Sequence, residues 1–583
     1  MSGKIVKVSG PLVVAEGLSD AGVADIVRIG AKGLLGEILT MADDLASIQV
    51  YDETGGLDIG AEVVTTDAPL SVELGPGLLG NIYDGVQRPF AGTGIPSGGA
   101  FALNRTREWK FAPALSMGTR VTGGCVIGTV EENPSVSHKI TVPLGVDGII
   151  ESIKGGSFTV EEPVCRIKTA EGTKDITLMQ KWHARVSRPF KKKHSPTTPL
   201  CSGQRVIDTF FPIAKGGTAA ISGSFGSGKT ALLHQLARWA DVDIIVYICC
   251  GERGNEMADL TAEFSNTKDP RSGEPLINRA VFIVSTSDMP IMSCDAAIYS
   301  GTAIAEYFRD MGYNVAVIAD SASRWAEALR EMSDHLGELP CEEGYPAYLA
   351  SRFAQFYERA GVFECLGDDE RLRGSLTVIS SVSPPAGNTS DVVSQLAIRF
   401  AKSFLELDGS LACSRHFPAV NPLTSLSMYA DTLESWFDSI CGTDFMKNRS
   451  RAISLLREEA EIQETAELIG YNSLSDNERL TLDAAKMIRE DFLQQDFSDE
   501  SDSYSPYEKQ YALLSLILKY NDYCSDAISK GVTDIQALFN IDAREAIARA
   551  KLARLPEFAV EYEAIDKEMS RQISEAISGG GEL

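Results

Sequence analysis

Residues 223–230 read Gly223-Ser224-Phe225-Gly226-Ser227-Gly228-Lys229-Thr230, which is the strongest structural signal in the sequence. It has the full G-x-x-x-x-G-K-T spacing of a phosphate-binding loop, or P-loop. A strand pattern from Thr218 to Ser222 precedes the loop, and a helical pattern from Lys229 to Ala240 follows it. Both flanks are the context that the motif requires. The stretch therefore predicts a central α/β P-loop (RecA-like) domain.

The residue types of the loop suit a polyphosphate. Glycines let backbone N–H groups surround a phosphate, and the N-terminus of the following helix adds roughly half a positive charge. We expect residues 223–230 to bind the nucleotide, with Lys229 reaching its β- and γ-phosphates and Thr230 ligating Mg²⁺. The alternative is a chance glycine-rich turn, against which the Lys-Thr ending and both flanks argue.

Strand and helix patterns alternate after Pro199. The further strand candidates are Asp243 to Cys250, Val281 to Ser285, Asn314 to Ala319 and Ser375 to Ser381. Helical patterns such as Asp295 to Met311 separate them. This alternation predicts a mostly parallel sheet with its ligands at the carboxyl ends of the strands.

Two carboxylates are expected at that edge. Asp320 directly follows the strand candidate Asn314 to Ala319, a position from which an aspartate holds Mg²⁺ directly or through water. The alternative for Asp320 is a capping or salt-bridging role. Glu252 and Arg253 follow the strand that ends at Cys250.

From that position we predict that Glu252 prepares the water that attacks the γ-phosphate, and that Arg253 organises acidic groups or phosphate oxygens. The alternative is a Glu–Arg pair that fixes a helix start. Glu256 lies one turn further along, where it either supports Glu252 or is simply exposed.

The remaining chain predicts a multidomain protein. Short apolar runs broken by Gly and Asp favour an N-terminal β-barrel over residues 1–70. Residues 71–109 are expected to be a connection and the first part of the nucleotide domain, and 110–185 a β-rich inserted domain. The P-loop domain then spans 186–432, and a C-terminal α-helical domain spans 433–583, with Ser475 and Glu478 forming a capping box.

Composition excludes several classes of protein. The net charge of −27 does not favour a nucleic-acid partner. Residues 191–194, Lys-Lys-Lys-His, are interpreted as a solvated linker rather than a binding patch. The longest apolar runs are strand-sized, and the first residues lack a secretory signal, so a cytoplasmic location is expected. Eleven scattered cysteines suggest reduced thiols, and adjacent Cys249 and Cys250 should point to opposite faces of a strand.

Together these motifs resemble the catalytic A subunit of V-type and A-type rotary ATPases, in the ATP synthase alpha/beta family. The resemblance covers nearly the whole chain. It includes the unit between barrel and P-loop, which resembles the insertion that distinguishes this subunit from F-type β chains. Further matching segments, in order, are 209–212 (TFFP), 251–256 (GERGNE), 306–310 (EYFRD), 320–330 (DSASRWAEALR), 343–348 (EGYPAY), 383–385 (SPP) and 415–418 (RHFP).

The resemblance implies partners and a reaction. It implies an alternating A3B3 ring with B-type subunits, central and peripheral stalks, and an indirect connection to a membrane sector that moves H⁺ or Na⁺. ATP would be hydrolysed or synthesised with Mg²⁺ at A–B interfaces that borrow an arginine from B, on the cytoplasmic side of the membrane. The coupled ion and the physiological direction stay open. Phe417 and Phe497 occupy positions that the resemblance assigns to adenine, with ordinary packing as the alternative.

The chain also departs from the family pattern. Ser222 and Ser224 stand where this family usually has proline, and 383–388 lacks a second usual glycine. Nucleotide affinity is therefore in question, whereas the reaction type is not. The alternatives are a homohexameric secretion-type ATPase, which would not need the inserted β-rich unit, a non-catalytic ring subunit, which should lack Glu252, and an RNA-translocating helicase, which the acidity disfavours.

Overall fold

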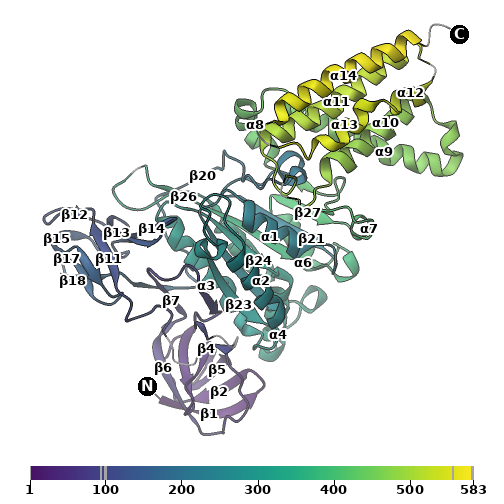
Figure 1. Ribbon diagram of the computed structural model, residues 1–583. Coiled ribbons are helices and arrows are strands. Elements are labelled where there is room, and N and C mark those ends of the chain that lie inside the picture. The colour runs from purple at the N-terminus through teal and green to yellow at the C-terminus, as the bar shows by residue number, and fades with distance from the viewer. Residues whose placement is uncertain are drawn as a thin grey trace.

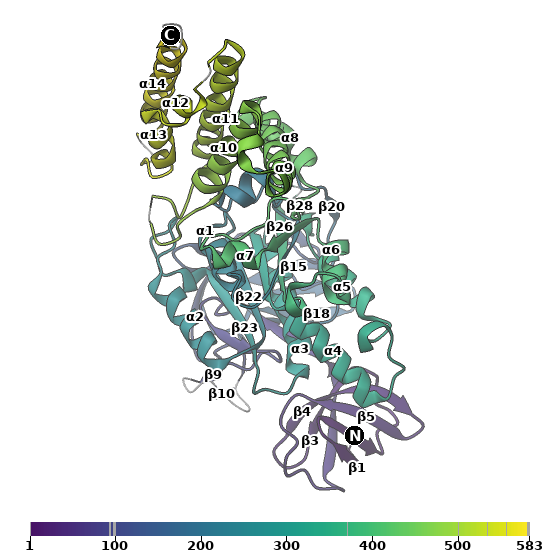
Figure 2. The same ribbon diagram turned by 90° about the vertical axis from the view of Figure 1, so that its right-hand side faces the viewer.

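The computed structural model describes residues 2–91, 95–96, 101–369, 371–499, 501–532, 534–554 and 557–579. The chain forms an elongated molecule with the N-terminal barrel at one end and a helical domain at the other (Figures 1 and 2). The P-loop domain lies between them, and a β-rich unit projects from its side. This is the architecture predicted from the sequence.

The N-terminal unit is a closed six-stranded barrel with strand order β1-β2-β5-β4-β3-β6. Its side chains alternate between inside and outside, as in β1, where Ile5 is buried between exposed neighbours. Arg185 joins the barrel to the P-loop domain by ion pairs of 2.8 Å with both Glu37 and Asp295. The strands are β1 Ser2–Ser9, β2 Leu12–Glu16, β3 Asp25–Ile29, β4 Leu34–Ala42, β5 Leu45–Val50 and β6 Glu62–Pro69.

The inserted β-rich unit consists of two four-stranded sheets, ordered β14-β13-β11-β16 and β12-β15-β17-β18. It docks on the P-loop domain through buried His138, whose Nε2 lies 2.8 Å from the Tyr307 hydroxyl. The strands are β11 Trp109–Pro113, β12 Arg120–Val121, β13 Val126–Asn133, β14 Val136–Thr141, β15 Gly148–Ile153, β16 Gly156–Phe158, β17 Pro163–Thr169 and β18 Gly172–Thr177.

The central sheet has the strand path β28-β27-β21-β26-β24-β22-β23-β8, and all pairs from β27 to β8 are parallel. Strand β8 comes from the chain before the inserted unit, so two separate segments build this sheet. The strands are β8 Ile82–Asp84, β21 Thr218–Gly223, β22 Ile244–Glu252, β23 Ala280–Thr286, β24 Asn314–Asp320, β26 Arg373–Val382, β27 Ser403–Leu407 and β28 Leu426–Ser427.

Helices cover both faces of this sheet. Cys249 packs in the core shared with α1 and α2, whereas Cys250 packs in the core shared with α3 and α4. The prediction that these two side chains face opposite ways is confirmed, and all eleven cysteines are free thiols. The helices are α1 Lys229–Trp239, α2 Gly254–Asn266, α3 Met292–Asp310, α4 Ala322–Leu336, α5 Leu349–Glu358, α6 Val392–Phe400 and α7 Gly409–Cys413.

The interpretation of 191–194 as a solvated linker was wrong as to the linker, although residues 191–193 are exposed to solvent as expected. Lys192–His194 forms strand β20, which pairs with β25, Gly361–Glu364. Lys193 also donates to the Glu358 carbonyl at 2.7 Å. Local sequence could not indicate this strand, because its partner β25 lies far along the chain and provides the hydrogen bonds for its backbone N–H and C=O groups. The remaining short strands are β7 Ser71–Leu74, β9 Phe90–Ala91, β10 Ile95–Pro96 and β19 Gln180–His183.

The C-terminal domain is helical, as expected. The capping box is confirmed at the start of α10, where the Ser475 and Glu478 side chains each bond the other's backbone N–H. No helix in the described ranges is long and apolar enough to cross a bilayer. The helices are α8 Ala430–Ile440, α9 Phe445–Ile469, α10 Asp476–Met487, α11 Tyr507–Ser529, α12 Ile535–Phe539, α13 Asp542–Ala550 and α14 Phe558–Gly579.

Candidate active site

The P-loop connects β21 to α1 in the conformation that its glycines allow. Gly226 and Gly228 have φ angles of 80° and 90°, in the left-handed region that favours glycine. Gly228 is also the N-cap of α1, so the N-terminus of this helix opens at the loop. Such a helix end is ready to bind an anion.

Lys229 folds back onto its own loop. Its Nζ donates to the carbonyl oxygens of Gly223 at 2.6 Å and Ser224 at 3.0 Å. Burial lowers the pKa of Lys229, and the nearby charges of Asp320 and Glu252 oppose that shift. These three ionisable groups therefore share one environment. Thr230 is exposed on the first turn of α1.

Sheet order explains why these residues meet. In the path β21-β26-β24-β22 the strands are parallel, so their carboxyl ends lie at one edge. Asp320 is the last residue of β24, and Glu252 is the last residue of β22. The P-loop begins where β21 ends.

Asp320 is a buried carboxylate that accepts hydrogen bonds from two neutral hydroxyl groups. Its Oδ1 accepts from the Ser381 hydroxyl at 2.5 Å, and its Oδ2 from the Tyr247 hydroxyl at 3.4 Å. Burial raises the pKa of Asp320, and the Ser381 hydrogen bond opposes the shift. Sequence reasoning missed both hydroxyls, although Ser381 ends a strand that had been identified.

Glu252 is a partly buried carboxyl group at the end of β22. Burial, the charge of Asp320 and a hydrogen bond with Glu256 raise the pKa of Glu252 to about 8. Glu256 is exposed on the first turn of α2, as one of its two expected descriptions had it, and its charge adds to the rise in the Glu252 pKa. Arg324 opposes the shift, and its side chain packs on Gly251, where an added Cβ would lie 3.0 Å from Arg324 Cγ.

Arg253 differs from the other predicted residues. It is the N-cap of α2, and its side chain is exposed. Within the part of the chain that the structure describes, no ion pair joins this side chain to Glu252, although Arg253 does lie at the start of α2.

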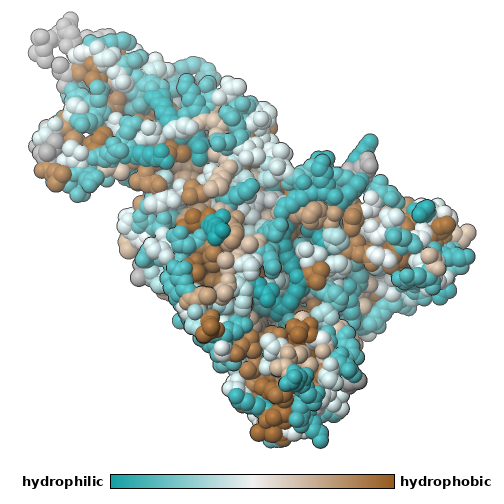
Figure 3. Space-filling model, turned by 180° about the vertical axis from the view of Figure 1, so that it is seen from behind, coloured by the Kyte–Doolittle hydropathy of each residue, from teal (hydrophilic) through white to brown (hydrophobic). Residues whose placement is uncertain are grey.

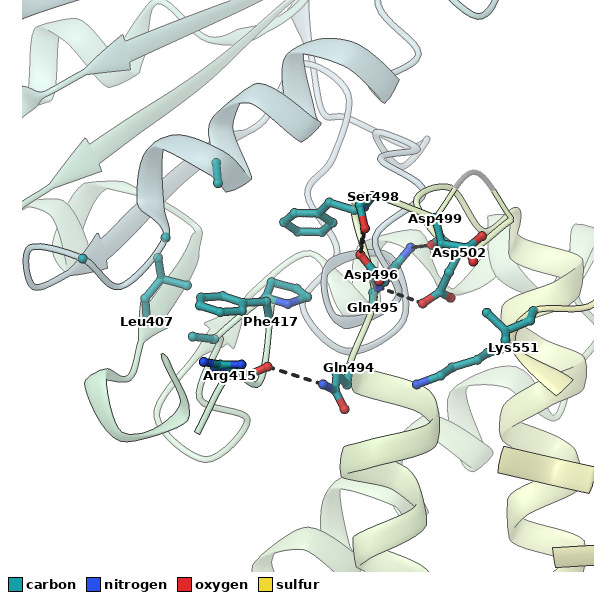
Figure 4. Close-up of a pocket in the computed structure, with 17 residues that line it drawn as sticks. Leu407, Arg415, Phe417, Gln494, Gln495, Asp496, Ser498, Asp499, Asp502 and Lys551 are labelled. Atoms are coloured by element: carbon teal, nitrogen blue, oxygen red, sulfur yellow. Dashed lines mark hydrogen bonds between the residues drawn. The ribbon is translucent and has the colours of Figure 1, made fainter. Parts of the chain in front are cut away.

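A cavity of about 790 Å³ opens beside the P-loop (Figure 4). Phe417 and Phe497 both line it, together with Gly226 and Gly228. The Phe417 ring carbon lies 3.4 Å from the position that a Cβ on Gly228 would take. The structure thus places the Phe417 ring beside the phosphate loop and the Phe497 ring in the lining of the same cavity. The other lining residues are Ala231, Leu407, Arg415, Pro418, Ala419, Gln494, Gln495, Asp496, Ser498, Asp499, Asp502, Lys551 and Leu552.

Comparison with known proteins identifies the family of this chain. Residues 203–427 match the family model described as ATP synthase alpha/beta family, nucleotide-binding domain. The chain is 53% identical over 588 residues to a V-type ATP synthase alpha chain of Clostridioides difficile, covering 100% of this chain and 99% of that protein. The chain belongs to the ATP synthase alpha/beta family.

Other parts of the chain match models of the same family. The matches are its beta-barrel domain at 5–67, its barrel-sandwich domain at 100–185 and the C-terminal domain of V and A type ATP synthase at 434–535. V-type ATP synthase alpha chains of Acetivibrio thermocellus and Clostridium novyi are 53% and 50% identical, over 99% and 100% of this chain and 99% of each relative. The similarity therefore extends from end to end.

Ser222 and Ser224, the two serines that stand where this alpha/beta family usually has proline, have different surroundings. Ser222 is fully buried in β21, and its hydroxyl has no hydrogen-bond partner in the described structure. The Ser224 carbonyl accepts from both Lys229 and the Ser227 hydroxyl, at 3.0 Å and 2.8 Å. The Ser224 backbone carbonyl thus helps to hold the P-loop and Lys229 in the observed conformation. The Ser222 side chain instead leaves its buried hydroxyl group without a hydrogen-bond partner in the described structure.

Proposed function

We propose that this chain is the catalytic subunit of a V-type rotary ATP synthase, which hydrolyses or forms ATP coupled to H⁺ or Na⁺ transport. The observation that carries the proposal is the shared sheet edge. There the P-loop, Asp320 and Glu252 meet at the carboxyl ends of neighbouring parallel strands. The relatives that match over the full length are named V-type ATP synthase alpha chains.

Nucleotide binding begins at the P-loop. Residues 223–230 present backbone N–H groups and the N-terminus of α1 to the phosphates. Lys229 exchanges its bonds to the Gly223 and Ser224 carbonyls for the β- and γ-phosphate oxygens. Those carbonyls hold the ammonium group close to the loop until it reaches the phosphates.

The donor set at this edge fits Mg²⁺. The Thr230 hydroxyl is accessible on the first turn of α1, and the Asp320 carboxylate ends the nearby strand. Hard oxygen donors of this kind, few in number, suit a magnesium ion that keeps waters and phosphate oxygens as its other ligands. When bound, Mg²⁺ neutralises charge on the phosphates.

Glu252 acts on the attacking water in this proposal. A carboxylate must be ionised to accept a proton, and cationic charge at the site lowers the pKa of Glu252 from its raised value of about 8. Arg253, exposed beside it, is free to contact phosphate oxygens or acidic groups.

Phe417 and Phe497 are proposed to hold the adenine. They line the cavity that adjoins the loop, so a base attached to phosphates in the P-loop would enter it. Aromatic faces stack on a base with a free energy of about 1–3 kcal/mol each.

Family membership and the exposed apolar surface of the barrel both indicate that this chain contacts other subunits. We propose an alternating ring with B-type subunits, joined to central and peripheral stalks and through them to the membrane sector, on the cytoplasmic side. Figure 3 shows apolar surface at the barrel end of the molecule. The barrel exposes Val6, Val23, Leu45, Ile59 and Val64, which suits contact with neighbouring subunits.

The test is the native complex isolated from membranes. We expect subunit masses for an alternating ring with stalks, and ATP-driven transport of H⁺ or Na⁺ into vesicles. A homohexamer of this chain would instead indicate the secretion-type alternative, and a ring in which Glu252→Gln changes no turnover would indicate a non-catalytic subunit. The names of the relatives favour neither alternative.

A further inference from the structure

Arg205 carries a fully buried guanidinium group in the segment that leads to the P-loop strand. Its side chain donates to the carbonyl oxygens of Phe492 at 2.5 Å and Gln494 at 2.7 Å. Its third contact is an ion pair of 2.6 Å with Asp502. A buried cation is costly unless its donors are paired. All of its side-chain partners come from the C-terminal part of the chain.

Asp502 connects Arg205 to residues that line the cavity. It is only 1% exposed. Its second carboxylate oxygen accepts from the Asp496 N–H at 2.8 Å, and its carbonyl accepts from Gln495 Nε2 at 2.6 Å. Asp496 and Gln495 both belong to the segment 494–499, which lines the cavity. Asp502, which itself lines part of the cavity, therefore holds this segment in place.

Gln495 completes the connection. Its side-chain oxygen accepts from the Arg205 N–H at 3.0 Å, and its own N–H donates to the Phe417 carbonyl at 2.8 Å. Figure 4 shows Gln495 between Asp502 and Phe417. The Phe417 ring in turn lies beside Gly228. An unbroken series of contacts thus runs from Arg205 to the ring beside the phosphate loop.

We propose that the Arg205–Asp502 pair positions the nucleobase wall, defined as segment 494–499 together with Phe417, and thereby sets affinity for the base. Arg205 is a positioning residue, because it is fully buried and is not part of the cavity lining. Asp502 lines the cavity, and we assign it a positioning role through its hydrogen bonds to the wall. The inference rests on the proposed function, in which the P-loop holds the phosphates and this cavity receives the base.

The guanidinium group is required for this arrangement. Its planar fork serves two carbonyls and a carboxylate at once, whereas a lysine ammonium is a point charge without that geometry. Arg205→Lys and Asp502→Asn should therefore both loosen the wall. Asp502→Asn also turns an amide donor or a weaker acceptor toward the Asp496 N–H.

The experiment compares the affinity of the full chain for Mg·ATP with its affinity for magnesium inorganic triphosphate, which has no base. In Asp502→Asn and Arg205→Lys we expect ATP affinity to fall at least about tenfold, with triphosphate affinity unchanged within about twofold. The matched control is Asp483→Asn, which breaks the 2.6 Å pair with Arg544 in the same helical domain. It should change neither affinity.

An equal loss for both ligands, or no loss for ATP, overturns the positioning role. If Asp502→Asn does not fold, Arg205→Met combined with Asp502→Leu removes both charges while keeping apolar volume, which proteins often tolerate. This double variant should show the same selective loss. A wild-type chain that binds neither ligand contradicts the proposed function itself, so the two failures are distinguishable.

Discussion

Glu252 and Asp320 end neighbouring parallel strands, and the charge of Asp320 is the second-largest cause of the raised pKa of Glu252, after burial. The sheet thereby brings two carboxyl groups together beside the ammonium group of Lys229, whose pKa responds to both. Such perturbed groups concentrate at functional sites. This arrangement is consistent with the two proposed roles, in which Asp320 binds Mg²⁺ and Glu252 accepts a proton from the attacking water.

Glu252→Gln should separate binding from chemistry. The amide keeps the size of the side chain but cannot accept a proton, so we expect ATP affinity within a few-fold of wild type and turnover lower by at least about a hundredfold. Nucleotide binding and steady-state hydrolysis by the assembled complex measure the two effects. Glu263→Gln, on the exposed face of α2, is the control. Unchanged turnover in Glu252→Gln would remove its assigned role.

Asp320→Asn should lower the apparent affinity of the site for Mg²⁺. The amide loses the negative charge that attracts the cation, so the Mg²⁺ concentration for half-maximal turnover should rise by about tenfold or more. Titration of Mg²⁺ at fixed ATP measures this shift. Asp259→Asn removes an exposed charge from α2 and should leave the titration curve in place. A wild-type curve for Asp320→Asn would contradict the metal assignment.

Sequence patterns predicted those parts of the site that depend on local spacing. The P-loop, Glu252 and Asp320 each follow a strand directly, so periodicity was enough to place them at one edge. The assignment of Phe417 and Phe497 to the adenine rested only on the family resemblance. Arg205 and Asp502 could not be paired from the sequence, because nothing local indicates a contact across 297 positions. The strand at Lys192–His194 was missed for the same reason, since its partner is β25.

Phe417→Ala should weaken ATP binding more than triphosphate binding. Loss of one aromatic face removes about 1–3 kcal/mol of stacking, which corresponds to roughly a five- to hundredfold loss of affinity. Phe497→Ala tests the second ring in the same way. Phe190→Ala, a partly exposed ring next to β20, is the control. If both cavity variants bind ATP as the wild type does, the two rings are packing residues only.

Ser222→Ala should stabilise the P-loop domain. The buried Ser222 hydroxyl has no hydrogen-bond partner in the described structure, and an unsatisfied buried polar group costs about 1–3 kcal/mol. Its removal should raise the thermal midpoint by a few degrees, at about the 2–4 °C per kcal/mol typical of larger domains. Calorimetry of the nucleotide-free chain measures it. Ser224→Ala leaves a backbone carbonyl contact intact and should shift the midpoint less, whereas a lower midpoint for Ser222→Ala would show that the hydroxyl has a partner.

Asp208→Asn should change how stability depends on pH. Asp208 is fully buried, and burial raises its pKa to about 7, compared with about 4 in an unfolded chain. The folded state therefore keeps a proton that the unfolded chain releases, so the stabilisation is complete below about pH 4 and is lost as pH rises through about 7.

The asparagine variant lacks this titration. We expect the thermal midpoint of the wild type to fall more steeply than that of Asp208→Asn between about pH 5 and pH 8, with the two proteins most alike at the acidic end, where the wild-type carboxyl group is neutral like the amide. The control Asp259→Asn alters an exposed carboxylate and should follow the wild-type slope. Parallel curves for wild type and Asp208→Asn would mean that Asp208 is ionised throughout, held by the N–H groups of Ser202 and Gly203.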